Sequence, residues 1–475
     1  MHVSDSDGRQ TDAEYLADHP DFPAKTIVAT LFIGAFFGYL NDTLLNVALT
    51  PIMRDFGVDK TTVQWLTTGF LLVMGAFTPI TAGVIQWLDT RRMVLLTQAV
   101  FLTGSLVCAF APTFGVLVAG RMVQAVSAAF FVPLLFNGIL SIYPPARRGT
   151  AMGVITMMFT AAPAMGPTLS GIIDHTHWRV LFGFTVPFML AAMVLVAKFL
   201  TVNLSRITRP KIDTLSAVLS VTGFGALVYA SSNFAALPWE RFVLLSAASL
   251  VLIAWFARRQ FHLATPLLNL RAFGYAQFRY SVVILAGAVF LFLGLELMMP
   301  MYTQQVLLLT GTATGLILLP ASIAQAAAAP LFGRLLDKKS GRFVVLPATV
   351  MMMVSLAVMW LFLRLDTQTA ALSAMFALMA VSVSACVTGE THGLNALPKQ
   401  LNPHGAAIMT TINPIAGALG AAFFVGTTNI GEQLSSAPAP QAKMLDGIHL
   451  AMGCALLLAA GLVFFATKLR AGKAV

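Results

Sequence analysis

The chain has 475 residues, of which 58% are hydrophobic and only 10% are charged. Soluble proteins carry about 25% charged residues, so the composition excludes an ordinary soluble domain and predicts an all-α polytopic membrane protein. A transmembrane β-barrel is excluded as well, because it would show alternating segments of about ten residues. The net charge of +10 would suit a nucleic-acid partner, but the positions of the charges argue against one.

Fourteen apolar runs are each long enough to cross about 30 Å of hydrocarbon. In chain order they cover roughly residues 26–49, 62–84, 93–111, 115–140, 150–173, 180–200, 214–235, 241–257, 280–302, 312–333, 343–363, 370–393, 406–429 and 448–467. Longer basic segments separate them into six, two and six spans. The expected division is a tail (1–25), a first set (26–200), a linker with two extra spans (201–279), a second set (280–467) and a tail (468–475).

Lysine and arginine are distributed unequally between the two sides of this arrangement. With the N-terminus placed inside, 22 of the 29 lie in cytoplasmic segments, 6 lie outside, and Arg121 falls within a span. This asymmetry predicts that both chain ends are cytoplasmic, and it explains the basic charge by topology, so no nucleic-acid partner is expected. Cys108, Cys386 and Cys454 all lie within spans, so no disulfide framework or metal site is indicated.

Residues 149–173 (GTAMGVITMMFTAAPAMGPTLSGII) combine an apolar span with prolines and small residues. Two adjacent stripes at helical spacing are Ala162, Gly166 and Ser170, and Pro163, Pro167 and Gly171. A helix with so little side-chain volume on one side can be approached closely by another helix. The simpler interpretation is a kinked packing helix.

Charged side chains inside a bilayer cost about 2.5–3.5 kcal/mol on insertion scales, so each one needs a partner or a function. Asp42 lies in the first span with Asn46 one turn later, and Arg121 lies in the fourth span with Gln124 on its face. Asp42 is a candidate acceptor for Arg121 if the two helices adjoin. The alternatives are a structural acceptor for Asp42 and a fixed, helix-orienting charge for Arg121.

Two further carboxylates lie in the second set of spans. Glu296 is deep in the ninth span, and Glu390 is in the twelfth, with His392 two positions later and therefore on a different face. A carboxylate whose surroundings alternate between low dielectric and a nearby arginine can take up and release protons. The alternatives are partial exposure near the outer interface for Glu296 and polar helix-end roles for Glu390 and His392.

A weak internal repeat supports two related halves. GVIQWLDTRRMVLL (Gly83–Leu96) follows the second span, and GRLLDKKSGRFVVL (Gly333–Leu346) follows the tenth. Duplicated halves around a central pathway are common in transporters.

Four motifs together resemble those of the major facilitator superfamily, in its fourteen-span drug:proton antiporter family of lincomycin-resistance type. They are LNDTLLNVALTPI (Leu40–Ile52), GRMVQAVSAA (Gly120–Ala129), APAMGPTLSG (Ala162–Gly171) and HWRVLFGFTVP (His177–Pro187), the last with Thr185 where Asn is usual. The loop after the second span departs from the family pattern, because Trp87 and Thr90 occupy its usual Asp and second Gly positions.

The resemblance implies two six-helix bundles around a cavity, with two extra linker helices, and proton-driven export of small amphipathic or cationic compounds by alternating access. It implicates Arg121 in proton transfer and identifies Pro163, Gly166, Pro167 and Gly171 as the antiporter motif. With the carboxylates inside the spans, the expected proton-coupling residues are Asp42, Arg121, Glu296 and Glu390. The substrate cavity is expected to include Asn46, Gln124, Asn137, His392 and Asn413. The cytoplasmic gate is expected to include Gly83, Arg91, Arg92, Asp337 and Arg342.

No cofactor or metal is expected, since the proton gradient supplies the energy, and the expected partners are small molecules, protons and the lipid bilayer. A monomer in a bacterial inner membrane is expected, and docking of a periplasmic adaptor is left open. Two other transport functions stay open: a dedicated exporter of one metabolite and a proton-coupled symporter. A non-transporting receptor lacks the expected soluble domain, and an enzyme lacks a nucleophile–base constellation.

Overall fold

The computed structural model describes residues 23–470 except 59, 64, 173–177, 205–206, 208–212, 233–236, 264–265 and 310. The side chains at 42–43, 46–47, 50, 60–61, 68, 159–172, 232 and 311–312 also lie outside the description. The described residues form helices and connecting loops, with no strand among them. The predicted all-α membrane fold is confirmed.

The first half of the chain contains α1 to α9. Their bounds are α1 (Ala24–Phe56), α2 (Lys60–Val63), α3 (Trp65–Val84), α4 (Thr90–Ala109), α5 (Phe114–Ile142), α6 (Pro145–Ile172), α7 (Arg179–Phe199), α8 (Thr214–Ser232) and α9 (Trp239–His262). The second half contains η3 (Leu270–Gly274), α10 (Ala276–Met301), η4 (Tyr302–Val306), α11 (Gly311–Lys338), α12 (Gly341–Phe362), α13 (Thr369–Thr388), α14 (Glu390–Asn395), η5 (Lys399–Leu401), α15 (Asn402–Leu434) and α16 (Pro440–Thr467).

Among all the described residues, thirteen helices are long and apolar enough to cross a membrane. The 28-residue α6 occupies the position of the remaining expected span. Helices are the expected solution, because a lipid-embedded backbone must satisfy its hydrogen bonds internally. Side chains cap several helix starts: Asp89 accepts from the backbone N–H of Arg92 at α4, and Ser340 accepts from that of Phe343 at α12.

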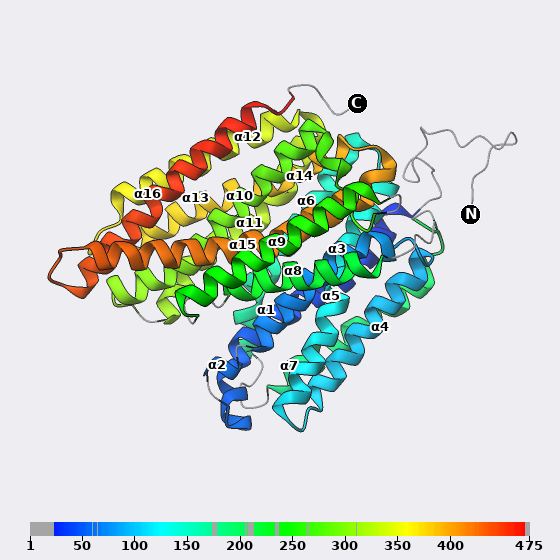
Figure 1. Cartoon of the computed structure of the whole chain (residues 1–475), viewed down its shortest axis with the longest axis horizontal. Coiled ribbons are helices and arrows are strands. Elements are labelled where there is room, and N and C mark those ends of the chain that lie inside the picture. The colour runs from blue at the N-terminus through cyan, green and yellow to red at the C-terminus, as the bar shows by residue number, and fades with distance from the viewer. Residues whose placement is uncertain are drawn as a thin grey trace, which may run out of the picture.

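The long helices form two groups that meet along one seam (Figure 1). In the first group α1 packs on α5, α6 and α7, and in the second α10 packs on α15 and α16. The groups contact each other chiefly through α6 against α11, with further contacts of α15 on α3 and α5. Figure 1 shows the blue-to-cyan and the yellow-to-red helices diverging toward the lower left, away from the end where α1 begins and α16 ends.

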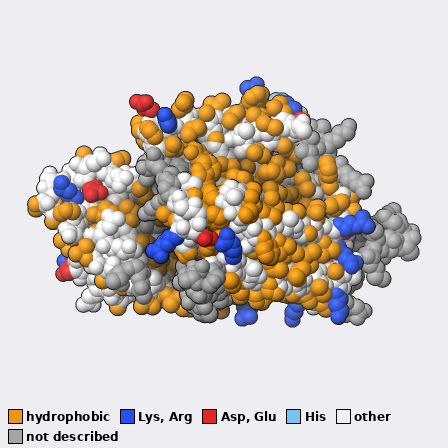
Figure 2. Space-filling view, turned by 90° about the horizontal axis from the view of Figure 1, so that it is seen from below, with side chains coloured by type: hydrophobic (Ala, Val, Ile, Leu, Met, Phe, Trp, Pro, Cys, Tyr) orange, Lys and Arg blue, Asp and Glu red, His pale blue; other side chains and the backbone are white. Residues whose placement is uncertain are grey.

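The linker helices lie against both groups. Helix α8 packs on α3 and α15, and α9 packs on α8. Large apolar side chains of α9, including Leu244, Val251 and Trp255, are exposed, as a lipid-facing helix requires. Figure 2 shows hydrophobic side chains covering much of one face of the molecule, with Lys and Arg side chains along its right-hand edge.

A partly exposed ion pair joins the start of α8 to α9. Both oxygens of Asp213 accept hydrogen bonds from Arg259, at 2.6 Å from Nε and 2.9 Å from Nη2, and Asp213 also accepts from the backbone N–H and hydroxyl of Ser216. Hydrogen bonds from Arg259 and Ser216 hold the pKa of Asp213 well below its usual range.

The ion pair predicts acid-sensitive attachment of the linker helices. Because its pKa is lowered in the folded state, Asp213 stabilises the fold above the ordinary carboxylate pKa, and this contribution is lost as pH falls through the folded-state value. Asp213→Asn should lower the melting temperature in detergent by several degrees at pH 7, and the gap should narrow toward pH 3. Asp366→Asn, at an exposed position, is the control. Equal melting temperatures of Asp213→Asn and wild type at pH 7 would contradict this role.

Candidate functional site

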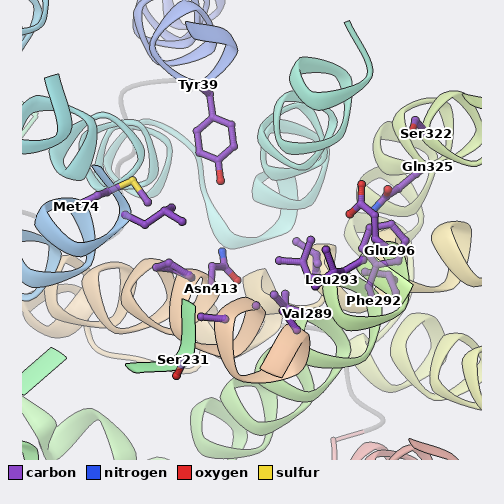
Figure 3. A pocket seen from close by; sticks show the side chains of 18 of the residues that line it. Tyr39, Met74, Ser231, Val289, Phe292, Leu293, Glu296, Ser322, Gln325 and Asn413 are labelled. Atoms are coloured by element: carbon purple, nitrogen blue, oxygen red, sulfur yellow. The ribbon is translucent and has the colours of Figure 1, made fainter. Parts of the chain in front are cut away.

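A central cavity of about 520 Å³ lies between the two groups of helices. Its wall is mainly apolar and aromatic, with polar side chains contributed by both groups. The polar lining residues are Tyr39, Thr156, Ser231, Glu296, Ser322, Gln325 and Asn413. Figure 3 shows the ring of Tyr39 extending from α1 toward the middle of the cavity, with Asn413 below it. Concave, mostly apolar sites with a few polar groups are typical of small-molecule binding.

Glu296 is the one charged side chain on this wall among the residues that the structure describes. It extends from α10 beside Phe292, and Gln325 and Ser322 of α11 lie near it in Figure 3. A lone carboxylate in apolar surroundings is poorly solvated, so it favours either a bound proton or a bound cation. Glu296 is therefore the described group on this wall that can bind either one.

Arg121 lies one layer behind the cavity wall. Its side chain is fully buried, and its guanidinium stacks 4.2 Å from the ring centroid of Phe70, a cavity-lining residue. Its Nη1 donates to Asn41 Oδ1 at 3.1 Å and to Gln124 Oε1 at 3.0 Å, while Nε donates to the Leu66 carbonyl at 3.3 Å. A buried guanidinium is stable only with such acceptors and a favourable ring face.

The network extends across the first group of helices. Gln124 donates to Ser105 on α4 at 2.8 Å, and Asn41 Nδ2 lies 3.5 Å from the hydroxyl of Thr185 on α7. Thr185, the position at which the chain departs from the family pattern, is therefore the outermost member of the Arg121 network. The network joins α1, α3, α4, α5 and α7 around one charge.

Several predicted cavity residues lie elsewhere. Asn413 lines the cavity as predicted, and so does Glu296, which was predicted for proton coupling. Gln124, Asn137 and His392 are buried elsewhere and do not line the cavity. Gln124 accepts a hydrogen bond from Arg121 instead. His392 lies near the end of the molecule where α11 ends, and its Nε2 is 3.2 Å from Gln277 Oε1. Asp42 and Asn46 were also predicted as site residues, but their side chains lie outside the description. The same holds for Pro163, Gly166, Pro167 and Gly171.

A second feature, here named the latch, closes the end of the molecule where α6 begins and α11 ends. Asp337 of α11 accepts hydrogen bonds from the backbone N–H groups of Gly149 and Thr150 of α6, at 2.6 and 2.8 Å, and from the Thr150 hydroxyl. The backbones touch here, because a methyl group added to Gly333 would lie 2.3 Å from the Gly149 carbonyl oxygen. Glycine is therefore required at Gly333 for this approach.

Arg148 joins the latch from the neighbouring residue of α6. It is buried and donates to Asn395 of α14 at 2.8 Å and to the carbonyls of Leu140 and Tyr143 at the end of α5. Asn395 in turn donates to the Pro145 carbonyl at 3.3 Å. A small pocket of about 110 Å³ lies beside these contacts, lined by residues that include Asp337, His392 and Asn395.

The first copy of the repeated loop does not form the contacts expected of the predicted cytoplasmic gate. Asp89 caps α4 and pairs with Arg92 at 3.2 Å, a contact within one loop. Gly83 lies at the end of α3, nearest to Leu267, while Arg91 and Arg342 make no ion pair within the described residues. The hydrogen bonds of the latch come from the second copy, through Asp337.

Sequence reasoning missed Asn41, Arg148 and Asn395 in these networks and Ser231 among the residues of the cavity wall. Asn41 directly precedes the predicted Asp42, and no local pattern indicates that Asn41 accepts a hydrogen bond from Arg121. Arg148 was counted as a loop cation because it stands beside Arg147 in a basic turn. Ser231 was missed because the linker helices show few intramembrane polar residues.

Comparison with known proteins gives consistent matches. A family model described as Major Facilitator Superfamily matches residues 31–421. The lincomycin resistance protein LmrB of Bacillus subtilis is 35% identical over 419 residues, covering 86% of this chain and 87% of that protein. The multidrug resistance protein Stp of Mycobacterium tuberculosis is 28% identical, covering 83% of this chain and 74% of its own length. The solved structure of the human organic anion transporter MFSD10 (TETRAN) aligns with a TM-score of 0.67 at 15% identity, over 94% of this chain and 99% of that one.

The Arg121 network predicts a stability cost at Gln124. Gln124→Leu removes one acceptor from a buried charge and the donor to Ser105, so it should destabilise the protein by about 1–3 kcal/mol. Thermal unfolding in detergent measures the loss, and Gln305→Leu, at an exposed position, is the control. An unfolding temperature equal to wild type would show that Gln124 does not support Arg121.

Proposed function

Since this chain belongs to the Major Facilitator Superfamily, we propose that it is a proton-coupled exporter of small amphipathic or cationic compounds that works by alternating access. The observation that carries the proposal is an apolar cavity between two helix groups, with the single carboxylate of Glu296 on its described wall and a closed latch at one end. A protein that exposes one site alternately to two sides requires this arrangement. The proton gradient supplies the energy, with no cofactor.

The relatives support export of drugs. LmrB is named for lincomycin resistance and Stp for multidrug resistance, and LmrB matches over most of both chains. The mainly apolar wall favours loose contacts with varied molecules, while the carboxylate favours a positive charge. We therefore expect a range of substrates that share an apolar body and a basic nitrogen.

Coupling follows from competition at Glu296. When the cavity faces the proton-rich side, a proton binds and displaces a cationic substrate; when it faces the cytoplasm, the substrate binds and the proton leaves. Asp42, Arg121 and Glu390 are the proposed further coupling residues. Arg121 contributes a fixed positive charge behind Phe70. This charge opposes the simultaneous binding of a proton and a cationic substrate in the cavity.

The latch is the proposed cytoplasmic gate. The excess of Lys and Arg on that side of the chain supports a cytoplasmic position for the latch and for both chain ends, in a bacterial inner membrane. The described conformation is then closed toward the cytoplasm. The proposed rocking bodies are residues 26–200 and 280–467, with the linker helices of 201–279 between them, and the small-residue face of α6 (Pro163, Gly166, Pro167, Gly171) serves as their sliding contact.

A transport assay with a matched pair of variants tests the function. Expression should lower cellular accumulation of ethidium, and collapse of the proton gradient should restore it. Glu296→Gln keeps the shape of the side chain but removes its charge, so it should reduce export at least tenfold, whereas Glu432→Gln, at the far end of α15, should export normally. Unchanged accumulation of a wide panel of cationic compounds on expression would contradict drug export, and full activity of Glu296→Gln would contradict its coupling role.

A further inference from the structure

The second helix group presents polar side chains to the cavity at two separate places. Glu296 of α10 lies beside Gln325 of α11 at the first place, here named the carboxylate end, and Asn413 of α15 marks the second, here named the amide end (Figure 3). Leu293 of α10 lies between them in the same view. All four residues line one cavity, so a single bound molecule can contact both ends.

The relative direction of α10 and α15 follows from their contacts. At one end, Gly405 of α15 lies next to the ring of Phe278 of α10, and further along both helices Gly420 lies against the backbone of Phe290. Residue numbers rise together along the contact, so the two helices run in the same direction. Positions along one helix can therefore be compared directly with positions along the other.

Helix geometry then gives the distance between the two ends. A methyl group added to Gly417 of α15 would lie 2.5 Å from Leu293 of α10, so these two residues are at the same level. Glu296 lies three residues beyond Leu293, and Asn413 lies four residues before Gly417. With a rise of about 1.5 Å per residue, the carboxylate end and the amide end are about 10 Å apart along the helix axes.

The amide of Asn413 is not fully paired within the protein. Its Oδ1 is buried and has no hydrogen-bond partner in the described part of the chain. The terminal torsion of an asparagine side chain is broad and roughly two-fold, so rotation of the amide can present either Oδ1 or Nδ2 to the cavity. A hydroxyl or a primary amide of a bound molecule suits this position, because each can both donate and accept.

The rest of the cavity wall favours an apolar body. It includes the side chains of Val289, Leu293, Phe70, Met74 and Phe131, from both helix groups. Apolar surface gains free energy by leaving water for such surroundings, whereas a polar group placed there without a partner loses its hydration. A bound molecule is therefore most stable when its polar groups lie at the carboxylate end and the amide end and its apolar body lies between them.

We propose that the cavity recognises its substrates at two points, with a protonated amine at the carboxylate end and an uncharged hydroxyl or amide about 10 Å away at the amide end. This rests on the proposed function and narrows its substrate class. Cationic amphipathic compounds with a second, neutral hydrogen-bonding group at this distance are preferred over those without one. Asn413 is the residue that determines this specificity.

Calorimetric titration of the purified protein in detergent tests the proposal without transport. The probes are an aryl-alkyl amine with a primary amide about 10 Å from its nitrogen and an analogue in which an isopropyl group replaces the amide. The ratio of their affinities, amide over isopropyl, should be about fivefold larger in wild type than in Asn413→Leu, as one neutral hydrogen bond provides. Asn429→Leu, at an exposed position of the same helix, should keep the wild-type ratio.

A second pair of probes, identical but with a shorter spacer, tests the distance. In wild type, the affinity ratio of the long pair should be about fivefold larger than that of the short pair, because the short amide cannot reach Asn413 while its amine is at Glu296. This comparison needs no variant, so it stays decisive if Asn413→Leu fails to fold. Equal ratios for the long and short pairs in wild type would overturn the proposal, and so would equal ratios for the long pair in wild type and a folded Asn413→Leu.

Export of the same amines separates this inference from the proposed function. Proton-driven export of the amines together with equal affinity ratios would overturn two-point recognition and leave the proposed function intact. Unequal ratios as expected, with export that is indifferent to the proton gradient, would overturn the proposed coupling and support two-point recognition. A wild type that binds none of the amines would overturn both.

Discussion

The structure depends above all on one carboxylate at a seam. Asp337 accepts three hydrogen bonds from Gly149 and Thr150, and this is possible only because the backbones of α6 and α11 touch at Gly149 and Gly333. A carboxylate that accepts from backbone N–H groups makes strong, charge-assisted bonds. Because these contacts are confined to one end, they close that end while the central cavity lies between the halves. In the function proposed above, the latch sets which side of the membrane the cavity faces.

Both halves bury charged side chains near the cavity. In the first group, Arg121 donates to Asn41 and Gln124 behind the aromatic side chain of Phe70. In the second group, Glu296 lies on the cavity wall and Glu390 is buried. The described charges near the cavity thus come from both groups of helices. Loading an acid with a proton or a cationic molecule changes the charge balance across the same seam that the latch closes.

The sequence predicted the fold and the carboxylate on the cavity wall, because span length, charge asymmetry and polar residues inside apolar runs each have a direct physical meaning. Glu296 stands out as a carboxylate inside an apolar run, whereas Asp337 was singled out by the internal repeat and by the family's loop pattern. The sequence did not predict that Asn41 and Gln124 accept hydrogen bonds from Arg121. The packing of the helices decides which polar side chains meet. Arg148 and Asn395 were hidden for another reason: their contact joins positions 247 residues apart, which no local pattern encodes.

The central claim is that opening of the latch and closing of the opposite end are one coupled movement. Spin labels at Ala146 and Lys339, which both line the small pocket beside the latch, report the first distance. Labels at Arg54, near the end of α1, and Gln304, in η4 directly after α10, report the second. Cys108, Cys386 and Cys454 are first replaced by serine. On adding a transported substrate, the account predicts that the latch distance lengthens while the outer distance shortens in the same population. A latch distance that stays fixed in transport-competent protein, or two distances that change in the same direction, would contradict it.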